Sequence, residues 1–296
     1  MKRLTLLLAA CAALFSTMAV GKERRVYAPA SPWNMEYADN SCRLIRNFSD
    51  GRNSITAAFE RASPGPHMTL GLAGSALDVW KSAANASFFF GPGGKKRESG
   101  FYKMELADGR TSWLLSEASL LSHEEVTAIN SSPSDMPLPA PFARVREAEI
   151  DAGKAVSSVV ITEGFKQEIE LQLGSMADPV GAMEACVADL VRSWGLDPQR
   201  LETLSCAPQL LNAPEVGNTA RYPREMLRQS LGGLVEVRLI VDELGRADTC
   251  HINVAEPGPF EEAACKALMS VARFNPALDA EGKPTRSYWT QRIVFR

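Results

Sequence analysis

Histidine is scarce in this sequence: among 296 residues there are only three, His67, His123 and His251. Metal sites need several histidine, cysteine or carboxylate ligands at suitable spacing, and the run that begins at His123 has Thr127 where a zinc-protease helix would carry its second histidine. The chain also lacks a Gly-x-Ser-x-Gly motif, and its glycine-rich stretch 91–96 does not have the spacing of a phosphate-binding loop. The sequence therefore predicts no metal site, no cofactor and no catalytic site, and we expect a protein that is not an enzyme.

Charge of one sign is not concentrated anywhere in the chain. The formal net charge is −3, and acidic and basic residues are interspersed. Nucleic acids are bound by clustered lysine and arginine, so we expect no nucleic-acid partner. After residue 21 there is also no apolar run of membrane-spanning length.

The first 21 residues have the features of an export signal. Lys2 and Arg3 form a basic start, residues 4–20 are almost continuously apolar, and small residues end the run. This pattern is typical of a signal peptide that is cleaved before Lys22, and it predicts a periplasmic protein.

Two other interpretations of this segment send the chain across the same membrane. Cys11 lies in a lipoprotein-like motif, although most of the apolar run follows it. The segment could also remain uncleaved as an inner-membrane anchor facing the periplasm, but its 17 residues (4–20) are at the lower limit for spanning, and the positive charge beyond them disfavours that orientation.

Residues 22–206 predict a mostly antiparallel β domain with a few helices. Short strand-like segments recur about every ten residues, separated by glycine and proline clusters. The segments are 35–48, 55–61, 68–72, 86–90, 102–106 and 111–115, with two further strands in 156–173. Helical patterns cover 116–129 and 179–194, and a Pro- and Ser-rich break covers 131–141. These residues resemble no family, and the whole chain is expected to be α+β.

The last quarter, 222–296, predicts a small ββαβ domain after a polar linker, 207–221. Val235, Val237, Leu239 and Val241 alternate along the first strand. The expected elements are strand 234–241, turn 242–246, strand 247–254, helix 260–273 and strand 288–295.

This order of elements, together with five landmarks, resembles the TonB C-terminal domain family, which includes the energy transducer TonB. Individually the landmarks are common, but together they occur in the family's order and spacing. They are Tyr222-Pro223, Gly233, the run Val241-Asp242-Glu243-Leu244-Gly245-Arg246, Phe274-Asn275-Pro276-Ala277 and Ile293-Val294-Phe295.

The resemblance implies a domain that binds an extended peptide by adding it to a free sheet edge. The implied partner is a TonB-dependent outer-membrane receptor or another envelope protein, and the same edge could instead pair with a second copy of the chain. Because neighbouring side chains on a strand alternate, either Tyr288 or Trp289 must belong to a packed face. The matching edge residues are Tyr288, Trp289, Thr290, Gln291, Arg292 and Ile293.

The chain departs from an energy transducer in two respects. Thr219, Ala220 and Arg221 precede the Tyr-Pro pair, where the family often has Gln-Pro, and the chain has no long Pro- and Lys-rich spacer. These departures favour a soluble or accessory member of the family. The alternative hypothesis is that the β domain binds a ligand or catalyses a reaction, with the TonB-like domain as an adaptor.

Five cysteines would remain after cleavage of the signal peptide. In the fold that the resemblance implies, the helix packs on the hairpin, so a disulfide between Cys250 and Cys265 is expected. Cys42–Cys186 and Cys186–Cys206 both remain open as further pairings.

Overall fold

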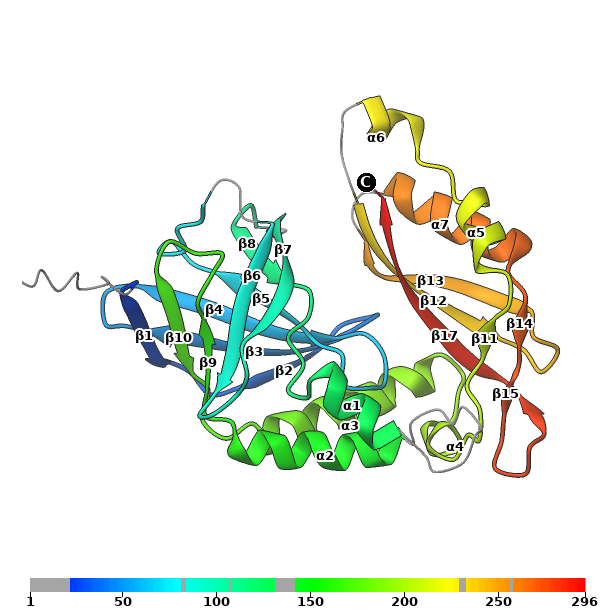
Figure 1. Cartoon of the computed structure of the whole chain (residues 1–296), viewed down its shortest axis with the longest axis horizontal. Coiled ribbons are helices and arrows are strands. Elements are labelled where there is room, and N and C mark those ends of the chain that lie inside the picture. Colours follow the sequence, from blue (N-terminus) through cyan, green and yellow to red (C-terminus); the bar gives the residue numbers. More distant parts are fainter. Residues whose placement is uncertain are drawn as a thin grey trace, which may run out of the picture.

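The computed structural model describes residues 22–80, 84–106, 108–130, 142–228, 233–255 and 258–295. The expected signal segment 1–21 and the expected break 131–141 lie outside these residues. Both strands and helices are abundant, so the fold is α+β (Figure 1).

A β-barrel forms most of the N-terminal unit, which we define as β1 to α4. Its sheet has the order β1-β10-β9-β6-β7-β8-β5-β4-β3-β2, and an additional β1–β3 pairing brings the two ends together. β1 runs parallel to β10, whereas the other described pairings in this sheet are antiparallel. The strands are β1 (Arg24–Pro29), β2 (Asn34–Tyr37), β3 (Cys42–Ser49), β4 (Ser54–Arg61), β5 (Thr69–Ala73), β6 (Asn85–Gly91), β7 (Arg97–Glu105), β8 (Thr111–Leu115), β9 (Ser158–Ile161) and β10 (Glu168–Gln172).

Alternation along the strands determines what fills the barrel. In β4, Ile55, Ala57 and Phe59 are buried at every second position, as expected for a strand with one face in a core. Arg61 takes the next inward position and is also buried. An arginine therefore lies where the pattern would place another apolar side chain.

Helix α1 (His123–Asn130) is shorter than the predicted helix 116–129. Its start is set by a capping box, in which the Glu125 N–H donates to Ser122 Oγ at 3.2 Å and the Ser122 N–H donates to Glu125 Oε2 at 2.7 Å. Residues 116–121 before this cap are not helical, so the prediction was wrong there.

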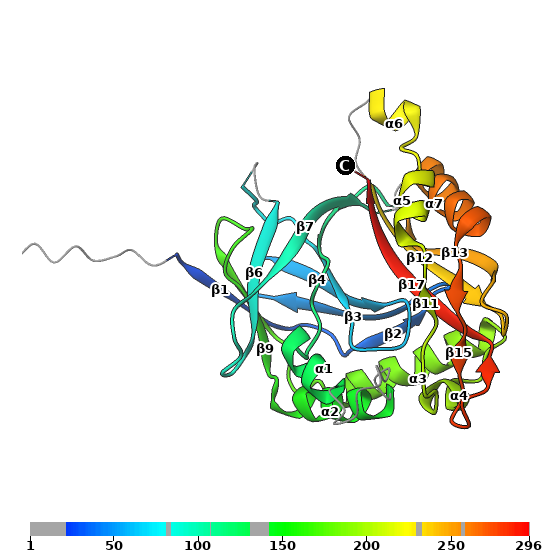
Figure 2. The same cartoon turned by 45° about the vertical axis from the view of Figure 1, so that its right-hand side comes forward.

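Two longer helices lie side by side below the barrel, α2 (Phe142–Ala155) and α3 (Ala177–Ser193) (Figure 1, Figure 2). The sequence pattern identified α3 but not α2. Helix α3 ends at Ser193, and Gly195 shortly after it has a φ of 75°, which suits glycine just past a helix C-terminus. A short helix, α4 (Pro198–Glu202), follows directly.

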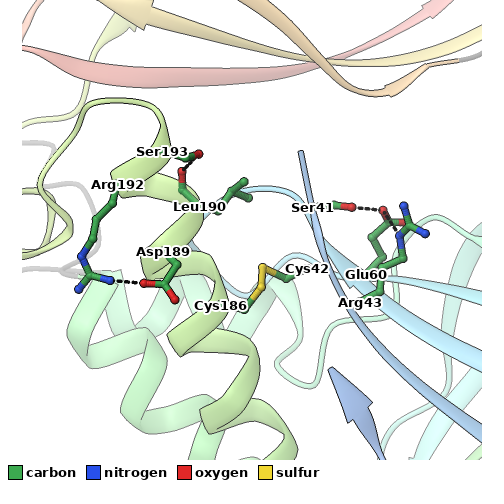
Figure 3. Close-up of a disulfide and its surroundings, with 9 residues drawn as sticks. All are labelled: Ser41, Cys42, Arg43, Glu60, Cys186, Asp189, Leu190, Arg192 and Ser193. Carbon is green, nitrogen blue, oxygen red and sulfur yellow. Dashed lines mark hydrogen bonds and ion pairs between the residues drawn. A yellow bond between two sulfur atoms is a disulfide. The ribbon is translucent and has the colours of Figure 1, made fainter. Parts of the chain in front are cut away.

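A disulfide joins α3 to the barrel. Cys186 bonds to Cys42 at the start of β3, with Sγ atoms 2.05 Å apart (Figure 3). Of the two pairings that the sequence left open, the structure therefore contains Cys42–Cys186, and Cys206 is a free thiol.

The C-terminal unit, β11 to β17, is a three-stranded sheet with a helix on one face. The sheet has the order β13-β12-β17, and α7 packs against β12 and β13 on the face that points away from the barrel (Figure 1, Figure 2). The buried core between them includes Val237, Leu239, Phe260 and Leu268. The elements are β11 (Gln209–Leu210), α5 (Ala213–Thr219), α6 (Arg224–Arg228), β12 (Gly233–Val241), β13 (Ala247–Ala255), α7 (Gly258–Val271), β14 (Phe274–Asn275), β15 (Ala277–Leu278), β16 (Pro284–Thr285) and β17 (Ser287–Phe295).

Two of the family landmarks contact each other at the hairpin turn. Gly245 has φ of 73°, and its carbonyl accepts a hydrogen bond of 3.0 Å from the Phe274 N–H. A Cβ atom at Gly245 would lie 2.0 Å from the Phe274 carbonyl oxygen, so only glycine fits this position.

The segment 207–221, expected to be a linker, carries ordered elements that pack on the C-terminal unit. β11 pairs with β14, and α5 lies against α7. The Asn212 side chain fixes this segment, because its Nδ2 donates to the Val271 carbonyl at 2.8 Å and its Oδ1 accepts from the Arg273 N–H at 2.9 Å.

Candidate functional site

The candidate site is the outer edge of β17. This strand pairs with β12 along its whole length, from Phe295 opposite Gly233 to Ser287 opposite Val241. Among the strands of the described residues, none pairs with its other side. A sheet edge of this kind presents main-chain groups that can pair with another chain.

Tyr288 and Trp289 are both packed, one on each face of the sheet. The Trp289 ring lies 5.3 Å from the Phe274 ring on the side of α7. The Tyr288 ring lies 5.4 Å from the ring of Trp194, which follows α3 in the N-terminal unit. The expectation that one of the two would be packed was therefore incomplete, because the N-terminal unit supplies a second packed face.

The middle of β17 is more accessible than its start. Thr290 is partly exposed and Gln291 is exposed. Arg292 and Ile293 continue the strand opposite Glu236 and Val235 of β12, and Ile293 is partly buried on the α7 side. The six predicted edge residues thus form one continuous strand, divided between two packed faces and an accessible middle.

The inter-unit cluster is the second packed face. It consists of buried residues from α3, the turn after it and α4, together with residues from β12 and β17. Its buried members are Val191, Leu196, Leu201, Ile240 and Tyr288. The C-terminal sheet is therefore held between α7 and the N-terminal unit.

A buried arginine borders this cluster. Arg238 of β12 is 2% exposed, and its guanidinium carbon lies 4.0 Å from the centroid of the Trp194 ring. Burial lowers the pKa of Arg238 to about 10. This pair was not predicted from the sequence, because the pattern of apolar residues in β12 indicates only the opposite face and Trp194 belongs to another unit.

The pKa values of His251 and Tyr288, which lie in the same region, are also shifted. His251 lies opposite Arg238 in the sheet, and its pKa is lowered by partial burial and by the charge of Arg238. Burial, with a smaller contribution from Glu184, raises the pKa of Tyr288. The hydroxyl of Tyr288 is therefore neutral at physiological pH.

The disulfide that was predicted in the C-terminal unit is present as well. Cys250, on β13, is bonded to Cys265 on α7, with Sγ atoms 2.00 Å apart. The bond ties the helix to the hairpin on the side of the sheet away from β17. It thereby fixes one edge of the sheet and leaves the other accessible.

Neither metal ligands nor a membrane helix is found in the described part of the chain. Those residues contain no group of three or more histidine, cysteine or carboxylate side chains arranged to hold a metal ion. They also contain no helix that is long and apolar enough to cross a membrane.

A three-stranded sheet with a helix on one face and an accessible edge strand defines a small α+β type of domain. Within this type, residues 218–296 match the family model described as Gram-negative bacterial TonB protein C-terminal. The chain thus carries a TonB C-terminal domain over this segment. None of the curated proteins matches the chain.

The family match gives the C-terminal unit a general role. A TonB C-terminal domain is a periplasmic type of domain from Gram-negative bacteria, and such domains interact with proteins. The match therefore indicates a protein-interaction role related to the cell envelope and transport. Residues 22–217 lie outside the matched segment.

Proposed function

We propose that this chain is an exported, non-catalytic binding module, and that β17 captures an extended peptide segment of a partner protein by β-augmentation. The partner would be a TonB-dependent outer-membrane receptor or another envelope protein. The observation that carries the proposal is the position of β17: it is held along its full length by β12 and has no strand on its other side among the described residues.

Packing on both faces supports the edge as the point of attachment. Trp289 is held on one face and Tyr288 on the other, so neither side chain needs to move when a strand is added. A pre-formed edge of this kind lowers the ordering cost of binding. Main-chain hydrogen bonds would then supply most of the affinity, and side-chain contacts beside Thr290 and Gln291 would fix the register.

A proline scan of β17 in the whole protein tests this proposal. Consecutive residues direct their N–H groups to opposite sides of a strand, so of Thr290 and Gln291 one donates toward β12 and the other outward. Thr290→Pro and Gln291→Pro should therefore differ, because proline has no N–H. The outward substitution should abolish peptide capture with little change in stability, and the inward one should destabilise the sheet.

Binding is measured by titrating the isotope-labelled protein with extended receptor peptides and recording backbone amide shifts. The expected shifts cluster on Ser287–Phe295. Gln291→Ala is the matched control, since it changes the side chain and keeps the N–H, and it should weaken binding much less than proline. Saturating peptide without shifts in β17 would refute the proposal.

Self-association through the same edge is a distinct outcome of this experiment. If two copies pair through β17, the amide shifts will depend on protein concentration in the absence of peptide. Such a result would replace peptide capture by dimerisation as the use of this edge.

A further inference from the structure

A group of buried charges lies between the barrel and helices α2 and α3, far along the chain from β17. Arg61 is the last residue of β4. Its guanidinium pairs through Nη2 with Glu149 Oε1 of α2 at 2.6 Å and through Nη1 with Glu184 of α3. The side chains of Arg61 and Glu149 are 0% and 1% exposed. Charges this deeply buried are normally retained only when their hydrogen-bonding capacity is met.

The hydrogen-bonding capacity of the Glu149 carboxylate is not met by the described residues. Its Oε2 atom has no hydrogen-bond partner there, and the Nε of Arg61 likewise has none. A buried carboxylate oxygen without a donor costs free energy, so such atoms call for a specific explanation. Burial also raises the pKa of Glu149.

A small cavity adjoins this carboxylate. Its volume is about 50 Å³, and Glu149 and Glu184 line it together with apolar side chains from α2, α3 and α4, such as Val145, Val187 and Leu201. One water molecule needs only about 10–15 Å³ of a cavity measured in this way, so the cavity has room for several groups of that size. We call it the acidic cavity.

The charges around the acidic cavity favour a cation. Glu149, Glu184 and Glu202 line it, against Arg146 in the lining and Arg61 behind it, which leaves one excess negative charge when all three carboxyl groups are ionised. Arg146 and Glu202 already pair with each other. Among the described residues, no group of three or more histidine, cysteine or carboxylate side chains is arranged to hold a metal ion, so we consider an organic cation.

We propose that the acidic cavity binds a primary alkylammonium ion, with the ammonium group donating to Glu149 Oε2 and the alkyl stem lying against the apolar wall. An ammonium group supplies the donor that Oε2 lacks and balances the excess charge. The valine and leucine side chains match a short hydrocarbon stem. The size of the cavity restricts the ligand to a small amine or to the amine end of a longer one.

Methyl NMR of the full-length protein with three matched probes tests the proposal. n-Butylammonium should shift the methyl signals of Val145, Val187 and Leu201. 1-Butanol has the stem without the charge, and tetramethylammonium has the charge without N–H donors. Each of these should bind at least about tenfold more weakly, which is the loss expected for a charged hydrogen bond.

Variants then assign the binding to the carboxylate. Glu149→Gln, in protein shown to be folded, should weaken n-butylammonium binding about tenfold or more. Asp189→Asn is the matched control on α3: it makes the same change of charge at an exposed pair with Arg192 (Figure 3) and should alter affinity less than about twofold. If Glu149→Gln does not fold, Glu184→Gln and the probe series on the unmodified protein decide.

Three results would overturn the proposal. The first is saturating n-butylammonium without shifts at the three methyl groups, as expected of a cavity that holds water alone. The second is equal binding of 1-butanol, which would leave only an apolar hollow. The third is unchanged affinity in folded Glu149→Gln.

Discussion

The guanidinium of Arg238 lies over the ring of Trp194 from the other unit, with its central carbon 4.0 Å from the ring centroid. Arg238 comes from the segment that matches the TonB family model, and Trp194 lies outside it. A cation over an aromatic face is stabilised by the ring quadrupole, and more strongly when water is excluded. This contact therefore couples the two units through a charge that would otherwise be exposed on the separated sheet.

The first prediction is a measurable coupling between Arg238 and Trp194. Trp194→Leu should lower the unfolding free energy by about 2 kcal/mol or more, since it removes packing and leaves the arginine buried without its ring. Arg238→Met should change it by less than about 1 kcal/mol, because loss of the contact is offset by relief of charge burial. A double-mutant cycle of these two substitutions, measured by urea unfolding followed by circular dichroism, should give a coupling free energy of about 0.5–2 kcal/mol between Arg238 and Trp194.

A second double-mutant cycle, which combines Trp194→Leu with a substitution of Arg286, provides the control for that measurement. Arg286 pairs with Asp248 and is not stacked on Trp194. Arg286→Met and Trp194→Leu should therefore be additive. Additivity in the Arg238 cycle as well would mean that the stacked geometry contributes nothing to stability.

The second prediction concerns acid sensitivity at His251. Its folded-state pKa is lowered from 6.5 by partial burial and by Arg238. As pH falls below 6.5 the unfolded chain takes up this proton first, so the His251 contribution destabilises the fold only on the acidic side. Urea midpoints measured at about pH 7.5 and 5 should fall less in His251→Gln than in the unmodified protein.

His123→Gln, which removes a histidine from helix α1, provides the comparison for His251. A difference in pH dependence specific to His251→Gln would support the assignment. Equal pH dependence of the unmodified protein and His251→Gln would contradict it.

The third prediction ranks the two disulfides. Cys250 and Cys265 are 15 positions apart, whereas Cys42 and Cys186 are 144 positions apart. In the chain-entropy account, the bond that closes the longer loop stabilises more. Replacing the first pair by alanine should cost about 3 kcal/mol, and replacing the second about 5 kcal/mol. The reverse order in denaturant unfolding would point to structure that persists in the reduced, unfolded chain.

The fourth prediction is a mature protein that begins at or near Lys22. The Lys22 ammonium donates to the Thr162 carbonyl at 3.1 Å and also to the Phe165 carbonyl, and β1 starts two residues later. Cleavage before Lys22 would therefore leave the folded unit intact. N-terminal sequencing of protein from the periplasmic fraction checks this, and Met1 recovered from washed membranes would instead indicate an anchor.

Local patterns in the sequence indicated the C-terminal elements well. Alternating apolar residues mark β12, and Gly245 marks the hairpin turn. Other parts of the fold depend on interactions between distant parts of the chain, which local patterns do not reveal. The segment 207–221 is ordered by Asn212, whose partners lie about sixty positions away, and β1 is placed by pairing with β10.

The last strand was predicted from the sequence, whereas its role as a free edge was expected only through the family resemblance. That Tyr288 would be packed by Trp194 depends on how the two units meet, which no local pattern describes. The acidic cavity is also not local, because Arg61, Glu149 and Glu184 come from three separate elements. In the sequence alone, each is one charged residue among many.

The pairing of β1 with β10 also constrains when the barrel can form. Arg24 and Glu168 are neighbours in the sheet but 144 positions apart in the chain. During synthesis, β1 emerges together with its partner β3 but long before β10, so the edge of β1 that pairs with β10 stays open during that interval. Closure of this ring is a late, non-local event, and its rate is governed by loop entropy more than by local preference. A chain that crosses a membrane as a thread would therefore complete its barrel only on the far side.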